Sequence, residues 1–312
     1  MTYVFGPVPS RRLGNSLGVN NIPIKHCSYS CVYCQVGRTT NLTVGRRTFY
    51  EPRRIIEEVV SAVEEYLGKI DYITFVPNGE PALDINLGKA IKGIKEKVEE
   101  KVAVITNGSL IGSAYQDLLL ADLVSVKIDA GSEDTYRRIN RPHPDISLRG
   151  VIDSVMDFRE KYNGTLLTET MLIDGLNDGE RDLKKTAKVV GRIAPEKAYL
   201  AIPVRPPLEP WVRPSSRVAE ARAIFRENGI NTDLLDFQEG AEFGTAGAED
   251  PSTSILNIIA VHPLREDYVR KILDDRQVST DQVIEWLIRW GKVRRIQYSG
   301  KSYLVLASSR TS

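Results

Sequence analysis

The sequence is poor in cysteine: it has three in 312 residues, and residues 35–312 contain none. A disulfide framework is therefore excluded, and a single disulfide would leave one cysteine over. No apolar run approaches the roughly 20 residues needed to span a bilayer. The N-terminal residues MTYVFGPVPSRRLG lack the apolar segment of a signal peptide. From these absences we expect a protein of the reducing cytoplasm that does not enter a membrane.

Acidic residues are absent from residues 1–50, which carry six basic residues. Residues 51–250 have the opposite sign, with 26 basic and 35 acidic residues, and residues 251–312 have ten basic and six acidic ones. The formal net charge of the whole chain is only +1. Two positive ends favour an anionic partner, although structural ion pairs could use the same charges.

The three cysteines lie together in the stretch KHCSYSCVYCQVG, with the spacing C-x3-C-x2-C. Thiolates are soft ligands that favour iron–sulfur clusters or zinc. Cys27, Cys31 and Cys34 could hold a four-iron cluster and leave one iron open to a small molecule. Two alternatives stay open: three reduced cysteines without a metal, and a zinc site in which His26 is the fourth ligand.

The alternation of strand-like and helical segments predicts an α/β fold with parallel strands. Strands are expected at 17–25, 71–76, 102–106, 123–128, 165–173 and 198–204. Helices are expected from Pro52 onward and at 85–100, 115–120, 148–162, 181–193 and 218–228. Residues 5–18 are rich in glycine, proline and serine, so we expect a loop there.

A second pattern follows residues 238–254, which are small and polar and are expected to be a linker. Helices are expected at 255–260, 265–273 and 279–290, the last with Ser279 as its N-cap, and a hairpin at 293–306 around Ser299-Gly300. This order resembles a winged helix-turn-helix. We expect three parts: residues 1–237, the linker 238–254 and a winged-helix-like domain at 255–308.

The motif C-x3-C-x-aromatic-C, with Tyr33 as the aromatic residue, resembles the signature of the radical S-adenosylmethionine (SAM) enzymes. The resemblance implies a partial (β/α)6 barrel in which the three cysteines hold a [4Fe-4S] cluster. It also implies that SAM is cleaved reductively to methionine and a 5′-deoxyadenosyl radical, which takes a hydrogen atom from the substrate. An electron donor such as ferredoxin or flavodoxin would reduce the cluster.

Further motifs resemble the SAM-binding segments of this superfamily, and they follow the expected strands, where parallel α/β folds place their sites. Asn78-Gly79-Glu80-Pro81 resembles the Gly-Gly-Glu-Pro motif that holds the SAM ammonium group, with Asn78 in place of the first glycine. An ordinary turn is the alternative. Thr106 and Asn107 resemble the next strand end that contacts SAM.

Three residues that alternate along the strand at 123–128 share one side of it: Ser125, Lys127 and Asp129. They are candidates for the methionine carboxylate and the ribose hydroxyls, unless Lys127 is a buried ion-pair partner. Glu169 lies in a segment that resembles the adenine-lining strand, and Ile202 follows the last expected strand at the same end.

Loops at this end carry basic and aromatic residues: Arg137, Arg138, Arg141, His143, Arg205, Arg213, Arg217, Tyr136 and Trp211. Such residues can clamp phosphates and stack bases, or form ordinary solvated loops.

The segments FGPVPSRRLG, SLGVN and CVYCQ are most similar to iron–sulfur oxidoreductases close to the archaeal wyosine synthases, which modify tRNA. Those synthases carry additional N-terminal cysteines, which this chain lacks. We therefore expect a radical SAM enzyme that modifies a nucleic acid, tRNA above all, and that docks it through the C-terminal domain. The alternatives are an enzyme that modifies or activates a protein or peptide, and an iron–sulfur DNA-binding regulator. The C-terminal domain could instead cover the open side of the barrel or mediate dimerisation.

Overall fold

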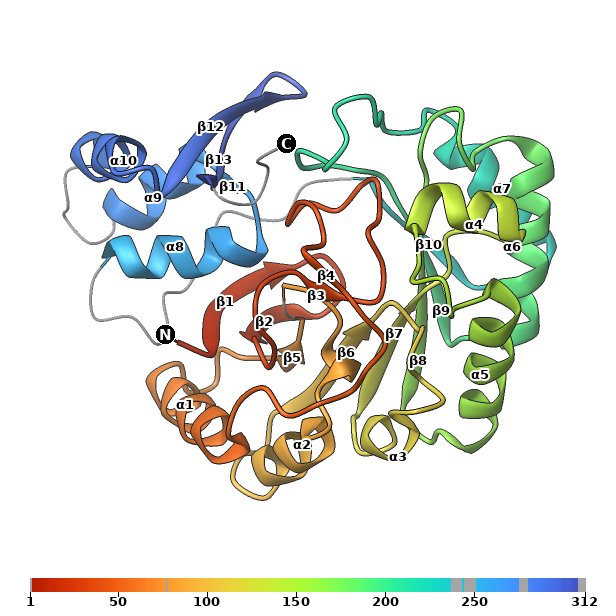
Figure 1. Ribbon diagram of the computed structural model, residues 1–312, viewed down its shortest axis with the longest axis horizontal. Coiled ribbons are helices and arrows are strands. Elements are labelled where there is room, and N and C mark those ends of the chain that lie inside the picture. Colours follow the sequence, from red (N-terminus) through yellow and green to blue (C-terminus); the bar gives the residue numbers. More distant parts are fainter. Residues whose placement is uncertain (1, 77, 237–242, 244–250, 275–279, 308–312) are drawn as a thin grey trace.

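The fold is described from a computed structural model, for residues 2–76, 78–236, 243, 251–274 and 280–307 (Figure 1). Pro77, the expected cap Ser279 and most of the expected linker lie outside these residues. Within them, no helix has the length and apolar character needed to cross a membrane.

A curled, eight-stranded sheet forms a half-barrel, with the strands in the order β1-β2-β5-β6-β7-β8-β9-β10 (Figure 1). The strands from β2 to β10 are parallel, and β1 pairs antiparallel with β2. The bounds are β1 (Val4–Ser10), β2 (Gly14–Val19), β5 (Tyr72–Phe75), β6 (Lys101–Thr106), β7 (Leu123–Lys127), β8 (Thr165–Met171), β9 (Lys197–Ala201) and β10 (Thr232–Leu235). The expected α/β half-barrel is confirmed.

Helices follow the outer side of the curved sheet and bury one apolar face against it (Figure 1). They are α1 (Pro52–Glu65), α2 (Leu87–Lys95), α3 (Tyr115–Leu118), α4 (Glu133–Asn140), α5 (Leu148–Lys161), α6 (Glu180–Ile193) and α7 (Val218–Glu227). In α1, for example, Ile55, Val59 and Val63 are buried, at the spacing of one helical face. A smaller apolar cluster of Leu13, Ala103, Leu123 and Leu167, from the β1–β2 turn and three strands, forms separately from this main core.

The expected loop at residues 5–18 is wrong, because most of this segment forms the hairpin of β1 and β2. Proline removes a backbone donor, but β1 is an edge strand and its pairing is irregular between Phe5 and Val8, so Pro7 and Pro9 interrupt little. The strand expected at 17–25 correspondingly ends at Val19. The helix α4 and the strand β10 were not predicted either.

The C-terminal residues form a unit with its own apolar core, which includes Ile255, Ile258, Leu264, Ile284, Leu287 and Leu304. Its elements are α8 (Pro251–Val261), β11 (Leu264–Arg265), α9 (Glu266–Asp274), α10 (Thr280–Arg289), β12 (Val293–Tyr298) and β13 (Lys301–Leu306). The first helix begins four residues before the expected start at residue 255, and β11 was not predicted. The three strands pair in the order β11-β13-β12. The winged-helix assignment and the domain bounds stay predictions.

This C-terminal unit lies beside the N-terminal edge of the half-barrel, with α8 next to β1 (Figure 1). Hydrogen bonds between described residues join the two parts. The hydroxyl groups of Tyr298 and Tyr303 donate to the carbonyl oxygens of Pro203 and Val204, at 2.7 and 3.0 Å. The Gln35 side chain donates to the carbonyl oxygen of Val261 at 3.0 Å.

Candidate active site at the cysteine loop

The three cysteines lie in the connection between β2 and α1, which leaves the sheet at the carboxyl end of β2. Backbone hydrogen bonds fix this loop against the end of α4. Val32 N donates to Ile139 O at 2.9 Å, and Ser30 N donates to Asn140 O at 3.0 Å. The unpredicted helix α4 therefore supports the cysteine loop.

Each cysteine sulfur faces a side-chain nitrogen from a different part of the chain. Lys25 Nζ lies 3.3 Å from Cys34 Sγ. Asn107 Nδ2 lies 3.6 Å from Cys27 Sγ, and Asn140 Nδ2 lies 3.5 Å from Cys31 Sγ. Hydrogen bonds to sulfur are among the means by which proteins set the potential of an iron–sulfur cluster.

The surroundings oppose ionisation of two of the thiols and favour it at the third. Burial raises the pKa of Cys27 to about 12 and also raises the pKa of Cys31 above its ordinary value. Burial opposes ionisation of Cys34 as well, but the Lys25 ammonium and the backbone amides of Val36 and Gly37 outweigh it and hold the pKa of Cys34 below its ordinary value. Lys25 is buried, and among the described residues no carboxylate forms an ion pair with it. A negatively charged thiolate cluster would supply the missing counter-charge.

The arrangement of the thiols does not match a site for one ion. Among the described residues, no three cysteine, histidine, aspartate or glutamate side chains are grouped closely enough to hold a single metal. Zinc needs each thiolate about 2.3 Å from one point, whereas a four-iron cluster binds each cysteine through a different iron. The ring of His26 packs edge-on against Phe49, at 5.4 Å between ring centres.

The segment Asn78-Gly79-Glu80 lies directly against the cysteine loop. Lys25 N donates to Asn78 O at 2.8 Å, and Glu80 N donates to His26 O at 3.1 Å. Between these two bonds, a Cβ atom on Gly79 would lie 1.8 Å from His26 O. Only glycine permits this approach. The segment is therefore more than a surface turn, since it packs on the backbone of Lys25 and His26, the two residues before the first cysteine.

Glu80 is a buried carboxylate whose hydrogen-bond donors are all neutral. Its Oε1 accepts from Thr106 Oγ1 at 2.6 Å and from Ala82 N at 3.1 Å, and its Oε2 accepts from Asn107 N at 2.8 Å. Burial raises the pKa of Glu80 to about 7. Across the described residues Glu80 has no cationic partner, so an ammonium group of a ligand would fit this site.

Lys127 and Glu169 form an ion pair on neighbouring strands β7 and β8, and Arg12 from the β1–β2 turn pairs with the same carboxylate. All three side chains are largely buried. The ion-pair alternative for Lys127 therefore holds in this structure. Arg12 was not among the site residues predicted from the sequence, because the segment that carries it was expected to be a loop.

Asp129 connects the aromatic residue of the cysteine motif to α4. Its Oδ2 accepts from the Tyr33 hydroxyl and, at 2.7 Å, from Asn140 Nδ2, while its Oδ1 accepts from Met171 N at 2.8 Å. A carboxylate has about four acceptor positions, so one remains on Oδ1. Asn140 in turn reaches Cys31, so Asp129, Tyr33 and the cysteine loop form one network.

The remaining expected residues lie in different places. Ser125 is buried on β7, and Ile202 is half-buried after β9. Asn78 also lines a cavity of about 180 Å³ between β1 and α8. A second cavity of about 180 Å³ includes Ser16, Thr74 and Ile105 from three adjacent strands, with Arg12 and Gln35.

A sequence profile of the Radical SAM superfamily matches residues 21–187, more than half of the chain, including the cysteine loop and Glu80. The chain belongs to the radical SAM superfamily. A UPF0026 protein of Methanocaldococcus jannaschii is 43% identical to this radical SAM enzyme over 97% of the chain and 95% of the relative. A protein of Thermotoga petrophila named probable dual-specificity RNA methyltransferase RlmN is 25% identical over 70% of the chain and 64% of the relative.

The fold of this radical SAM enzyme is similar to a crystal structure of a radical SAM methyltransferase from Sphaerobacter thermophilus. The TM-score is 0.51, at 19% identity over 71% of this chain and 66% of the other. Radical SAM enzymes use a [4Fe-4S] cluster and SAM. The residues of the site fit both groups. The three thiols lie beside the buried ammonium group of Lys25, which suits the cluster. The buried carboxylate of Glu80 has no cationic partner among the described residues, which suits the ammonium group of SAM.

The basic residues expected in loops are mostly paired. Arg137 and Arg138 lie on α4, and Arg137 pairs with Glu133 one turn earlier. Arg141 pairs with Glu209, Arg217 pairs with Glu220, and His143 Nδ1 lies 3.5 Å from Asp145. The other three donate to neutral groups: Arg138 to Leu176 O, Arg205 to the Gln35 side chain and Arg213 to Pro210 O. Tyr136 is buried and bonds the Tyr29 hydroxyl at 2.7 Å, whereas Trp211 is 51% exposed. These residues therefore do not form, as a set, the open phosphate clamp that the sequence suggested.

Proposed function

We propose that this radical SAM enzyme modifies RNA, with tRNA as the substrate class, and that ferredoxin or flavodoxin supplies the electron. The placement of the cofactors rests on one observation. The segment 78–80 is hydrogen-bonded on both sides to the cysteine loop, so Glu80 lies beside the proposed cluster ligands Cys27, Cys31 and Cys34. Bound together, the reduced cluster and SAM supply a 5′-deoxyadenosyl radical.

In this proposal the residues of the chain bind and orient. Glu80 pairs with the ammonium group of SAM, and Lys25 offsets negative charge on the thiolates. Asp129 holds Tyr33 and Asn140 and offers its free acceptor position to a ribose hydroxyl. The other residues proposed to line the SAM site are Asn78, Gly79, Thr106, Asn107, Ser125, Lys127, Glu169 and Ile202.

RNA as the substrate is supported by the similarity to a protein named as an RNA methyltransferase, which extends over 70% of this chain. The positive C-terminal end, with ten basic and six acidic residues over 251–312, supports the same substrate class.

The test is to incubate the iron-loaded enzyme with SAM, dithionite and RNA from cells that lack this protein. We expect RNA-stimulated formation of 5′-deoxyadenosine and a mass change in nucleosides from the digested RNA. Cys31→Ala is the control that should abolish both. Formation of 5′-deoxyadenosine without any change in the RNA would contradict an RNA substrate.

A polypeptide substrate is the second candidate, and one feature favours it. Among the described strands β12 lies at the edge of its sheet, next to β13, and a sheet edge can accept an extended peptide. A mass change in a cellular protein, with unchanged RNA, would establish this alternative.

A further inference from the structure

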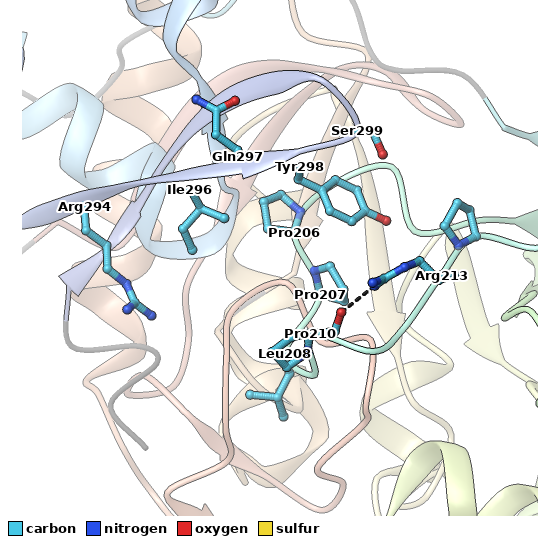
Figure 2. A pocket seen from close by; sticks show the side chains of 11 residues that line it. Pro206, Pro207, Leu208, Pro210, Arg213, Arg294, Ile296, Gln297, Tyr298 and Ser299 are labelled. Atoms are coloured by element: carbon cyan, nitrogen blue, oxygen red, sulfur yellow. Dashed lines mark hydrogen bonds between the residues drawn. The ribbon is translucent and has the colours of Figure 1, made fainter.

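A cleft of about 740 Å³ lies where the half-barrel meets the C-terminal unit (Figure 2). We call it the seam cleft. One wall is the loop after β9, residues 206–214, and the other is residues 294–299 of β12 and its turn. Figure 2 shows Arg294 and Arg213 at opposite ends of this cleft, with Ile296 and Pro207 between them.

The lining of the seam cleft combines positive charge with rigid, apolar side chains. Its two charged residues are Arg213 and Arg294, and no acidic residue is among those that line it in the described chain. The rest of the lining includes four prolines and Tyr298. A positive cleft with an aromatic ring and rigid apolar walls matches the backbone phosphates and the bases of a single-stranded nucleic acid.

Successive side chains of a strand point to opposite faces, so only one of the two adjacent arginines of β12 can point into the cleft. Arg294, Ile296 and Tyr298, which share one face of the strand, line the cleft together with Gln297 and Ser299 at its turn, and Arg295 is not among the lining residues. Arg295 lies on the other face, 3.1 Å from Glu266 and 3.0 Å from Glu285. Arg295 is therefore paired within the C-terminal unit, whereas Arg294 is among the residues that line the cleft.

The wall of the cleft rests on the cysteine loop. Glu209 N donates to Val32 O at 3.0 Å, and Arg205 Nη1 donates to Gln35 Oε1 at 2.8 Å. Val32 follows Cys31 and Gln35 follows Cys34. A nucleic-acid strand bound in the cleft would therefore lie next to the loop that carries the proposed cluster ligands. The same wall presents Trp211, which is 51% exposed.

We infer that the seam cleft binds a single-stranded segment of RNA, with phosphates at Arg294 and Arg213 and a base against Tyr298. This inference rests on the proposed RNA substrate and assigns the surface that holds it. A duplex does not fit, because unpaired bases are needed to reach an aromatic ring in a recess.

The experiment measures binding of a fluorescein-labelled oligouridylate to the full-length, iron-loaded protein over a salt series. Arg294→Ala should reduce the slope of log K against log salt by about 0.7, the value for one phosphate contact on a single strand. Arg294→Glu should weaken binding by about tenfold or more. The matched controls are Arg289→Ala and Arg289→Glu, because Arg289 is exposed on α10 outside the cleft and should leave binding near the wild-type value.

A second measurement does not depend on substitution. Photocrosslinking with a 5-bromouridine oligonucleotide should label the peptides that contain residues 206–214 or 294–299. Crosslinks confined to other peptides, or equal effects of the Arg294 and Arg289 variants, would overturn the cleft while leaving an RNA substrate in place. Equal competition by polyglutamate, which has the charge without the bases, would overturn a nucleic-acid site in favour of an acidic polypeptide. Absence of any RNA binding by the wild type would overturn the cleft and the proposed function together.

Discussion

Gly79 lies so close to His26 that a Cβ atom at position 79 would be 1.8 Å from the carbonyl oxygen of His26. That oxygen also accepts the amide hydrogen of Glu80 at 3.1 Å. The proposed SAM-ammonium residue and the residue that precedes the first cysteine are thus positioned by one backbone contact.

The first prediction concerns this contact. Gly79→Ala should displace the backbone at His26 and Cys27, because neither partner is the end of a flexible side chain, and iron content after anaerobic reconstitution should fall well below about four irons per chain. The control is Gly45→Ala, where the nearest atom is Thr43 Oγ1 at 3.6 Å. Equal iron content in both variants would show that this contact does not position the cluster ligands.

The second prediction concerns pH. Burial raises the pKa of Glu80 to about 7, and only the carboxylate can pair with the ammonium group of SAM. The ionised fraction of Glu80 rises about fivefold between pH 6 and pH 7, so SAM affinity should rise by the same factor. Glu80→Gln should remove this dependence and weaken binding by roughly 1.5–3 kcal/mol.

Calorimetric titration of iron-loaded protein with SAM at several pH values measures both effects. Glu65→Gln, at an exposed position on α1, is the control and should retain the wild-type profile. A Glu80→Gln profile that rises as steeply as that of the wild type would remove Glu80 from the ammonium site.

The third prediction concerns the reduction potential. The Lys25 ammonium lies 3.3 Å from Cys34 Sγ and favours the reduced, more negative state of a cluster bound there. Lys25→Met removes the charge at nearly constant volume, so the potential should become more negative. Loss of a charge-assisted hydrogen bond worth roughly 1.5–3 kcal/mol in the reduced state corresponds to a shift of the reduction potential on the order of 60–130 mV for one electron. Lys89→Met, on the exposed side of α2, is the control for spectroelectrochemical titration, and equal potentials would contradict the role of Lys25.

The helices and strands that the sequence predicted correctly are those in which the residues of the segment itself show a clear helix or strand pattern. The strand at 102–106 is a short β-rich run that ends at Asn107-Gly108, and the structure has it as Lys101–Thr106. The helix from Pro52 has a regular apolar stripe, and it forms over Pro52–Glu65. Such segments are recognisable because local propensity and burial agree.

The elements that were missed depend on their partners. The hairpin of β1 and β2 contains Gly6 and Pro7, which usually indicate a loop, and only its pairing with the sheet edge makes it a strand. Helix α4 has just two large apolar residues on its buried face, Tyr136 and Ile139. Lys25, which contacts Cys34, has a left-handed backbone with φ of 62°, and no spacing rule indicates such a conformation.

The last prediction concerns the bond between the cysteine loop and the C-terminal unit. Gln35 Oε1 accepts from Arg205 Nη1 at 2.8 Å, while its Nε2 donates to Val261 O at 3.0 Å. Gln35→Ala removes both bonds. Each hydrogen bond contributes about 0.5–1.5 kcal/mol net, so amide exchange at the end of α8 should accelerate by roughly tenfold, since 1.4 kcal/mol corresponds to tenfold.

Gln35→Glu separates the two bonds, because a carboxylate still accepts from Arg205 but cannot donate to Val261 O. If the bond to Val261 holds α8 in place, Gln35→Glu should accelerate exchange in α8 as Gln35→Ala does, while exchange in the loop at 203–214 stays slow. Gln282→Ala, at an exposed position on α10, controls for substitution of a glutamine. Hydrogen exchange followed by mass spectrometry reads both segments at once. Unchanged exchange in α8 for both Gln35 variants would mean that other contacts, such as those of Tyr298 and Tyr303, hold the C-terminal unit.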